Sequence, residues 1–185
     1  MKRIVLASKS PRRRELIKLI SDDVLCVAGC NEEYIPDNMQ VEDIPSHLAY
    51  LKAKSVAGAY PEDAVIGSDT VVICDGRLFL KPESEEDAFR MLSSLSGKTH
   101  KVITGCAIIC GEREEVFSST TLVEFYPLSE EEIRAYIGTK EPMDKAGAYG
   151  IQGKGGLFVK GIVGDYQNVV GLPVAELSRK LKEFM

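Results

Sequence analysis

The sequence predicts an α/β fold built on a mixed sheet, and two observations carry this prediction. Apolar runs of strand length alternate with segments of helical periodicity along the 185 residues. The dipeptide Asp75-Gly76 also joins two strand-like runs as a two-residue hairpin. Consecutive hairpins place antiparallel neighbours in the sheet, so a simple alternation of strand and helix does not fit. The length predicts one domain over residues 1–185, which can be built in two lobes.

Composition excludes several classes of protein. The hydrophobic fraction of 44% and the charged fraction of 28% are typical of a globular protein with a real core. The formal net charge is -5 although the N-terminal segment is basic, which argues against general nucleic-acid binding and favours a local anion pocket. No apolar run is long enough to span a bilayer, and the chain begins without a signal-peptide pattern. We therefore expect a cytoplasmic protein with neither nucleic acid nor membrane as a partner.

Apolar runs and capping residues predict the elements of the first half. Strands are expected at 4–7, 24–28, 64–74 and 77–80. Ser10 is a good N-cap and Pro11 suits the first helical position, so a helix should begin there. The apolar face of this helix would consist of Leu16, Ile17, Leu19 and Ile20. A second helix should begin at Pro45 and run to about Tyr60.

The second half follows from the same signals. Ser84 caps a helix that runs to about Leu95, and Ser129 with Glu132 forms a capping box for another that ends near Ile137. Strands are expected at 102–110, 116–125, 157–163 and 166–170, the last two as a hairpin around Gly164-Asp165. A glycine-rich stretch at 144–156 precedes the strand expected at 157–163, and a C-terminal helix begins at Pro173.

The segment Ser8-Lys9-Ser10-Pro11-Arg12-Arg13-Arg14 places three arginines in the first turn of a helix. The helix dipole is positive at that end, so cations are unfavourable there unless an anion binds among them. Serine hydroxyls, free N–H groups and guanidinium groups at one point all favour a phosphate. We therefore expect a phosphorylated ligand at this point; the alternative is a surface helix with solvated arginines.

Asp69 is the second candidate, because it interrupts an otherwise apolar strand. A buried carboxylate costs free energy unless it is paired, hydrogen-bonded or metal-bound. Gly67 nearby suggests a β-bulge that re-aims the side chain, whereas in a regular strand Thr70 would face the side opposite to Asp69. Asp69 is therefore a candidate metal ligand or general base, with a structural salt bridge as the alternative.

Other residues could add to phosphate chemistry, although each has an ordinary explanation as a solvated surface residue. Lys81 ends the partner strand of the same hairpin, where a lysine can contact a phosphate as a point charge. Glu32 and Glu33 offer a second carboxylate for Mg²⁺ or Mn²⁺. Gln152 lies in the glycine-rich stretch, and its amide can both donate and accept hydrogen bonds, which suits recognition of a base edge.

The five cysteines, at positions 26, 30, 74, 106 and 110, lie in apolar, strand-like surroundings. An odd number in such segments favours reduced thiols over a disulfide framework. The spacing of the pairs 26/30 and 106/110 differs from the tight CxxC hairpin of zinc sites, so a zinc site is disfavoured.

Together these residues indicate a phosphate ester or nucleotide as the ligand, with a metal ion, and do not say which bond is broken. In combination they resemble the Maf family of nucleoside triphosphate pyrophosphatases. The resemblance covers nearly the whole chain in order. The matching segments are Leu6–Arg13, Gly67–Thr70, Lys81-Pro82, Leu95–His100, Glu141–Gly153 and Val170–Pro173.

The resemblance implies an elongated, mixed-sheet, ITPase-like α/β structure with two lobes and a central cleft. It implies hydrolysis of a nucleoside triphosphate to the monophosphate and pyrophosphate, with a divalent metal cation, Mg²⁺ or Mn²⁺, as cofactor. Arg12 and the block around Gln152 resemble the branch that acts on dTTP and UTP. A homodimer is the assembly that the family suggests.

The resemblance also implies roles for individual residues. Asp69 matches the acid-base or metal-organising carboxylate, and Glu33 matches the second acidic position, although Glu32 leaves the register open by one. The positions that bind the triphosphate match Arg12, Arg13, Lys52 and Lys81, with Ser8 nearby. The positions associated with base choice match Arg12, Thr70 and Gln152.

Two alternatives stay open at this point. The first is a housecleaning pyrophosphatase for modified pyrimidines or inosine-type nucleotides. The second is a nucleotide-binding regulator of cell division, because Maf proteins are associated with arrest of septum formation. Release of pyrophosphate separates an enzyme from a regulator that only binds the nucleotide.

Overall fold

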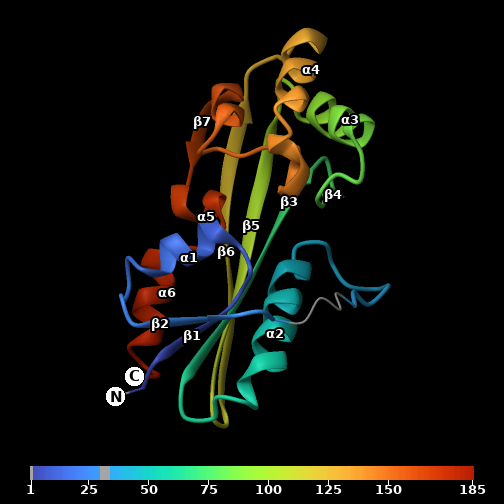
Figure 1. Cartoon of the computed structure of the whole chain (residues 1–185). Coiled ribbons are helices and arrows are strands. Elements are labelled where there is room, and N and C mark those ends of the chain that lie inside the picture. Colours follow the sequence, from blue (N-terminus) through green and yellow to red (C-terminus); the bar gives the residue numbers. More distant parts are fainter. Residues whose placement is uncertain (1, 30–33) are drawn as a thin grey trace. The chain divides into compact units, whose positions relative to one another are not determined.

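The computed structural model describes residues 2–29 and 34–185 (Figure 1). The strands are β1 (Ile4–Ala7), β2 (Val24–Val27), β3 (Ala64–Cys74), β4 (Arg77–Phe79), β5 (Thr99–Cys110), β6 (Arg113–Phe125) and β7 (Val159–Val163). The α-helices are α1 (Pro11–Ile17), α2 (Ile44–Ala57), α3 (Glu85–Leu95), α4 (Glu130–Gly138), α5 (Tyr166–Val170) and α6 (Val174–Leu181). Short 3₁₀ helices are η1 (Glu141–Asp144), η2 (Ala146–Ala148) and η3 (Lys154–Phe158).

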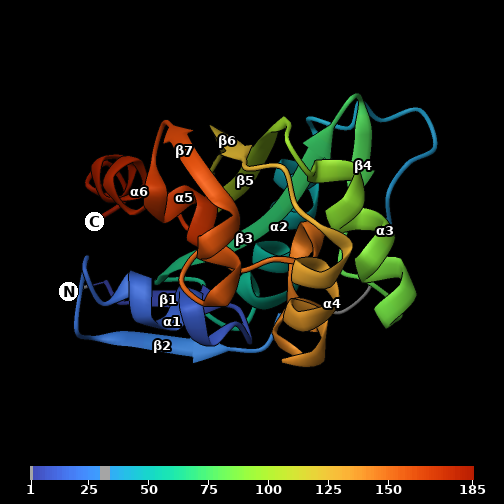
Figure 2. The ribbon, with the colours of Figure 1, turned by 90° about the horizontal axis from the view of Figure 1, so that it is seen from above.

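Among the described residues, one seven-stranded sheet has the order β2-β1-β3-β5-β6-β7, and β4 pairs with β3 beside this path. β1 runs parallel to both β2 and β3, and β1 and β2 are seen side by side in Figure 2. β4 is antiparallel to β3, and β7 is antiparallel to β6. The sheet is therefore mixed, as the hairpin pattern of the sequence predicted.

The chain divides into two compact units, which agrees with the expected two lobes. Unit 1 comprises Met1–Thr70, Thr104–Ser119 and Gly171–Met185, and unit 2 comprises Val71–Ile103 and Thr120–Val170. Each unit has buried hydrophobic side chains of its own. The central cleft stays a prediction.

In unit 1, helices cover both faces of the strands. The odd-numbered residues Val5 and Val65 pack in one cluster with Ala49 and Ala53 of α2. The even-numbered residues of the same strands pack in a second cluster, with α1 and α6; its strand members include Ile4, Leu6, Ala64 and Ile66. Figure 1 shows α2 on one side of these strands and α1 with α6 on the other. Because successive strand residues face opposite sides, the parity of a residue number decides which helix it meets.

Glycine at position 67 allows α2 to lie directly on β3. A Cβ atom there would be 2.0 Å from the carbonyl oxygen of Ala49 and 2.7 Å from the backbone nitrogen of Ala53. The pairing of β1 with β3 is regular up to Ala7 opposite Gly67. The sequence-based suggestion that Gly67 marks a bulge is therefore wrong for this pairing, since the glycine serves close helix packing instead.

Unit 2 has a core of aliphatic residues from α3 and α4 with a group of packed rings. His100 contacts Phe125 edge to face, with ring centroids 4.8 Å apart, and Phe125 contacts Tyr149 at 4.7 Å. The Nε2 atom of His100 lies 2.8 Å from the hydroxyl of Tyr149. Burial lowers the pKa of His100 to about 4, so this ring is neutral near pH 7.

Two local predictions fail. Residues 166–170 form the short helix α5 and not the second strand of a hairpin. Asp165 explains this, because its carboxylate accepts the N–H of Gln167 at 2.8 Å while Thr121 accepts the N–H of Asp165 at 3.0 Å. The helix α1 is also shorter than expected, and Leu19 beyond its end is 65% exposed and belongs to no apolar face.

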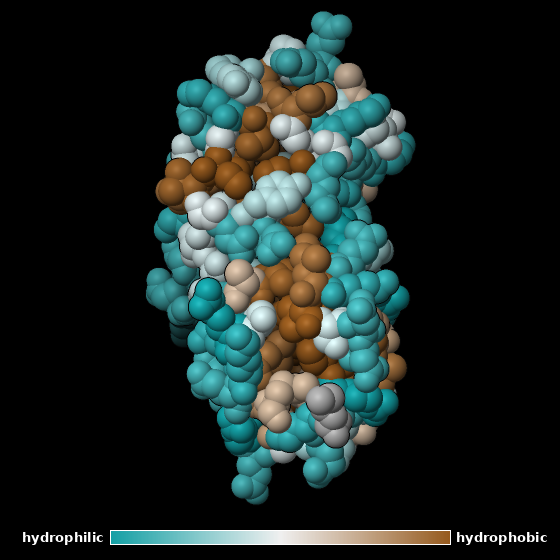
Figure 3. Space-filling view, turned by 90° about the vertical axis from the view of Figure 1, so that its left-hand side faces the viewer, coloured by the Kyte–Doolittle hydropathy of each residue, from teal (hydrophilic) through white to brown (hydrophobic). Residues whose placement is uncertain are grey.

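Exposed hydrophobic residues gather beside the edge strand β7. Leu157 is 81% exposed and Val163 is 73% exposed, and Val163 lies opposite Leu122 of β6. Figure 3, in which the side that carries β7 faces the viewer, shows hydrophobic residues (brown) at the surface. The predicted homodimer stays a prediction.

Within the described ranges, no helix is long and apolar enough to cross a bilayer.

Candidate functional site

Asp69 and Thr70 occupy successive positions of β3, so the pleat of the strand directs their side chains to opposite faces of the sheet. Asp69 follows Val65 and Gly67 on the face of α2, and there it meets Lys52. Thr70 lies on the face of α1, and there it meets Arg13. One dipeptide thus places a carboxylate and a hydroxyl on the two sides of the strand, as a regular strand predicts.

Lys52 and Asp69 form an ion pair between α2 and β3. The Nζ atom of Lys52 donates a hydrogen bond to Oδ1 of Asp69, and the two side chains are 15% and 13% exposed. The ammonium balances the charge of a carboxylate that the apolar strand holds mostly away from water. The residual exposure leaves both groups within reach of a ligand from solvent.

On the other face, Arg13 links three parts of unit 1. Its Nε atom donates to the carbonyl of Gly171 at 2.8 Å, and Nη2 donates to the hydroxyl of Thr70 at 2.9 Å. Thr70 also lies 2.9 Å from the hydroxyl of Thr104 on β5. The carbonyl of Gly171 accepts a further hydrogen bond from the buried hydroxyl of Ser68, at 3.3 Å. This network fixes the guanidinium plane of Arg13 beside β3.

The segment before α1 forms the local structure that the sequence predicted. Ser10 is the N-cap, and its hydroxyl accepts the N–H of Arg13 at 3.5 Å. Ser8 is buried, and its hydroxyl accepts the N–H of Ser10 at 3.2 Å. Arg14 donates from Nε to the carbonyl of Ser8 at 3.3 Å, and Arg12 is half-buried. Arg13 and Arg14 therefore hydrogen-bond within the protein, which argues against simple solvated arginines on a helix surface.

The remaining predicted residues lie elsewhere. Lys81 follows β4 and Gln152 precedes η3; both are exposed and belong to unit 2. Glu33, the predicted second metal ligand, and its neighbour Glu32 lie outside the described residues. The contacts within unit 1 thus connect Asp69 with Lys52 and Thr70 with Arg13, and the roles of the other positions stay predictions.

The donor set of unit 1 is compatible with a divalent cation that arrives with a phosphate. In the part of the chain that the structure describes, no three His, Cys, Asp or Glu side chains group as a metal site. Asp69 offers one carboxylate, the hard oxygen donor that Mg²⁺ and Mn²⁺ prefer. Magnesium is commonly held by one or two carboxylates together with substrate phosphates and water, so a single protein carboxylate fits this mode.

One described cysteine borders the network around Arg13, since the Sγ atom of Cys106 lies 3.8 Å from the hydroxyl oxygen of Ser68. Cys26, Cys74, Cys106 and Cys110 are free thiols, as the sequence predicted for them. Burial raises the pKa of Cys106 to about 12, so its thiol stays protonated at neutral pH. The thiols of β5 are therefore core residues.

Sequence reasoning missed Thr104 and Gly171 as partners of the site. Thr104 is fully buried in an apolar strand. A hydroxyl in such a strand needs a polar partner, so its position in the sequence could have indicated a buried hydrogen bond. Gly171 has φ of 129°, a conformation that favours glycine, and the role of its carbonyl was not foreseeable from the sequence. Both residues are distant in sequence from Arg13 and Thr70, so only the fold shows that they meet.

Comparison with known proteins gives consistent results. A relative from Bacillus velezensis named dTTP/UTP pyrophosphatase is 51% identical over 183 residues, which cover 99% of this chain and 97% of the relative. A relative of the same name from Bacillus cereus is 50% identical over 184 residues, covering 100% and 96%. The solved structure of the Ham1 protein of Staphylococcus aureus matches over 100% of both chains, with a TM-score of 0.54 at 16% identity. The last similarity concerns the fold alone, and it supports the predicted fold class.

The family model described as Maf-like protein matches residues 3–184 of the sequence. This range includes all of unit 2, unit 1 except its terminal residues, and each residue of the ion pair and of the arginine network. The chain therefore belongs to the Maf-like protein family.

Proposed function

We propose that this chain is a nucleoside triphosphate pyrophosphatase that hydrolyses dTTP and UTP to the monophosphate and pyrophosphate. The observation that carries the proposal is the ion pair between Lys52 of α2 and Asp69 of β3, with the Arg13–Thr70 network on the opposite face of the strand. Relatives at about half identity over their full length are named for this activity. Because this name denotes an enzyme, the relatives favour catalysis over the alternative of a nucleotide-binding regulator of septum formation.

In the proposed reaction, the oxygen of a water molecule forms a bond with the α-phosphorus. The bond between the α-phosphorus and the oxygen that bridges it to the β-phosphate breaks, and pyrophosphate leaves with that oxygen. Asp69 accepts the proton of the attacking water, and Lys52 balances the charge of the carboxylate beside it. Arg12, Arg13 and Lys81 neutralise the charge that develops on the leaving pyrophosphate. Most of the catalysis then comes from positioning and charge compensation.

A divalent cation would be held by Asp69 and Glu33 together with phosphate oxygens of the substrate. When bound, such an ion withdraws negative charge from the phosphate oxygens. Mg²⁺ and Mn²⁺ both suit carboxylate and phosphate ligands, and we propose one of them as the cofactor.

Base choice is proposed for Arg12, Thr70 and Gln152. The amide of Gln152 is exposed, and it can donate and accept at once, as the edge of a pyrimidine requires. Thr70 contributes to base choice through Arg13, because its hydroxyl accepts a hydrogen bond from the guanidinium of Arg13. Modified pyrimidine nucleotides with the same edge would be substrates as well.

The test is pyrophosphate release by the wild-type protein with Mg²⁺ or Mn²⁺ across dTTP, UTP, CTP, ATP, GTP, ITP and 7-methyl-GTP. We expect the highest kcat/KM for dTTP and UTP, and loss of activity when EDTA removes the metal. Preference for ITP or 7-methyl-GTP would contradict the proposed substrate. Binding of nucleotides without any release of pyrophosphate would contradict the enzyme and favour the regulator.

A further inference from the structure

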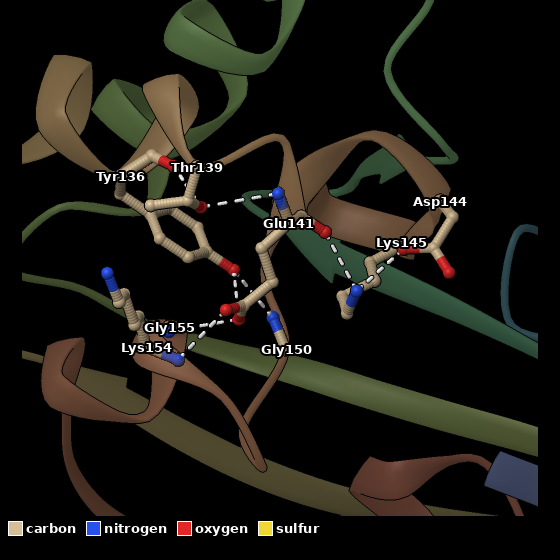
Figure 4. Close-up of polar contacts among 8 residues, drawn as sticks. All are labelled: Tyr136, Thr139, Glu141, Asp144, Lys145, Gly150, Lys154 and Gly155. Atoms are coloured by element: carbon tan, nitrogen blue, oxygen red, sulfur yellow. Dashed lines mark hydrogen bonds and ion pairs between the residues drawn. The ribbon is translucent and has the colours of Figure 1, made fainter.

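One carboxylate of unit 2 organises the backbone around Gln152. Glu141 begins η1, and its Oε1 atom accepts a hydrogen bond from the hydroxyl of Tyr136 at 2.9 Å. Oε2 accepts the backbone N–H of Lys154 at 3.0 Å, and Oε1 also accepts that of Gly155 at 3.3 Å. Figure 4 shows these groups converging on the Glu141 carboxylate.

Tyr136 extends the same arrangement to the other side of Gln152. Its hydroxyl oxygen accepts the N–H of Gly150 at 3.0 Å (Figure 4). The intervening turn is closed by a hydrogen bond from the N–H of Gly153 to the carbonyl of Gly150, at 3.3 Å. The backbone on both sides of Gln152 is therefore tied to one phenol–carboxylate pair.

The glycines of this turn are required by close approach. A Cβ atom at Gly153 would lie 2.3 Å from Oε1 of Glu141, and one at Gly155 would lie 2.7 Å from the hydroxyl oxygen of Tyr136. Real Cβ atoms do not come so near to other heavy atoms, so only glycine lets the backbone surround the carboxylate. Glycine at positions 153 and 155 thus lets the backbone pass close to the Glu141 carboxylate and the Tyr136 hydroxyl inside unit 2.

The electrostatics favour a charged carboxylate and a neutral phenol. Burial alone would raise the pKa of Glu141, but the N–H of Lys154, the hydroxyl of Tyr136 and the N–H of Gly155 together hold it below its usual range. Burial raises the pKa of Tyr136, so its hydroxyl stays protonated and can donate. Lys145 adds a hydrogen bond from Nζ to the Glu141 carbonyl at 2.7 Å. Hydrogen bonds to an ionised acceptor are the stronger kind, which suits a rigid support.

Gln152 itself is exposed, and its side chain has no hydrogen bond to any part of the chain that the structure describes. Its position is therefore set by the backbone on either side. We propose that Glu141 and Tyr136 are positioning residues for nucleotide discrimination, because they hold the backbone that presents Gln152. This inference rests on the proposed function, in which Gln152 recognises the base.

The experiment compares Glu141→Gln with wild type and with Glu130→Gln as the matched control. Glu130 carries the same change on an exposed ion pair with Arg134 of the same unit, away from the turn. Hydrogen exchange should become faster at the amides of Lys154 and Gly155 in Glu141→Gln, since the new amide group cannot accept both hydrogen bonds. The ratio of kcat/KM for dTTP over CTP should fall about tenfold, the usual scale for one lost charge-assisted hydrogen bond. The control should match wild type in both measurements.

Tyr136→Phe provides the second variant, which decides the question if Glu141→Gln fails to fold. It removes the hydroxyl that Gly150 and Glu141 share, and it should lower the dTTP preference in the same direction. A Gln152→Ala background should abolish the effect of Glu141→Gln on this preference, because there is then no amide to position.

Several results would overturn the inference. An unchanged dTTP preference in a folded Glu141→Gln variant would do so, as would an equal loss of activity with every nucleotide. An effect that persists in full beside Gln152→Ala would also contradict it. A wild type that releases no pyrophosphate from any nucleotide overturns the proposed function and the inference together, whereas a selective wild type beside unchanged variants overturns the inference alone.

Discussion

The contact between α2 and β3 predicts that Gly67→Ala is strongly destabilising. The added methyl group would lie 2.0 Å from the carbonyl oxygen of Ala49 and 2.7 Å from the nitrogen of Ala53. Both are backbone atoms of the helix, so no side-chain rotation relieves the contact and α2 must move away from the strand.

Overpacking of this kind costs about 1–3 kcal/mol, and we expect the upper end because backbone must shift. For a chain of this length, a loss of about 3 kcal/mol lowers Tm by roughly 6–12 °C. The same movement carries Lys52 away from Asp69, so pyrophosphate release should fall as well.

Urea unfolding followed by circular dichroism measures the effect, with Gly58→Ala as the control. Gly58 ends the same helix and has an ordinary helical φ of -61°, and a methyl group added there would meet no other atom within 4 Å. Its substitution should change the free energy of unfolding by no more than about 0.5 kcal/mol. If Gly67→Ala is also within about 0.5 kcal/mol of wild type, the reasoning about close packing is refuted.

Three further predictions follow from other contacts. In the unfolded chain His100 has a pKa near 6.5, and burial lowers it to about 4 in the folded protein. The unfolded state therefore gains its proton first as the pH falls, and the free energy of unfolding should drop by up to ~3 kcal/mol between pH 6.5 and pH 4. Urea unfolding at several pH values should show a shallower drop for His100→Gln, which keeps a partner for Tyr149; an equal drop would contradict the assignment. Ser129→Ala removes the capping box of α4 and should cost about 1 kcal/mol in the same assay, whereas no change would argue against the cap. Arg13→Lys should cost about 1–2 kcal/mol, since an ammonium cannot reproduce the two directed bonds of the guanidinium, and a fully stable variant would show that the network is dispensable.

Local signals in the sequence predicted much of the fold, because they depend on a few neighbouring residues. The bounds of β3 agree with its apolar run, and the Asp75-Gly76 turn has φ values of 51° and 72°, as its hairpin type requires. The capping box of Ser129 with Glu132 is present in full. Residues 166–170 were predicted as a strand because their apolar composition suits either structure, and the hydrogen bonds of Asp165 decide for a helix.

The candidate site was predictable only in part. Strand alternation alone places Asp69 and Thr70 on opposite faces. Their contacts depend on residues that are far away in the chain, such as Thr104 for Thr70. The close packing at Gly67 and the carboxylate of Glu141 inside a glycine-rich turn are likewise tertiary features, and no local pattern distinguishes them from a bulge or a flexible loop.

The most direct test of the proposed chemistry is the kcat for pyrophosphate release from dTTP by Asp69→Asn, measured beside Asp63→Asn. Asp63 precedes the same strand, and its carboxylate pairs with Arg3 outside the proposed site. If Asp69 accepts the proton of the attacking water, Asp69→Asn should remain folded and lose at least about a hundredfold in kcat, while Asp63→Asn keeps wild-type turnover. A kcat for Asp69→Asn near that of wild type would contradict the role of this carboxylate.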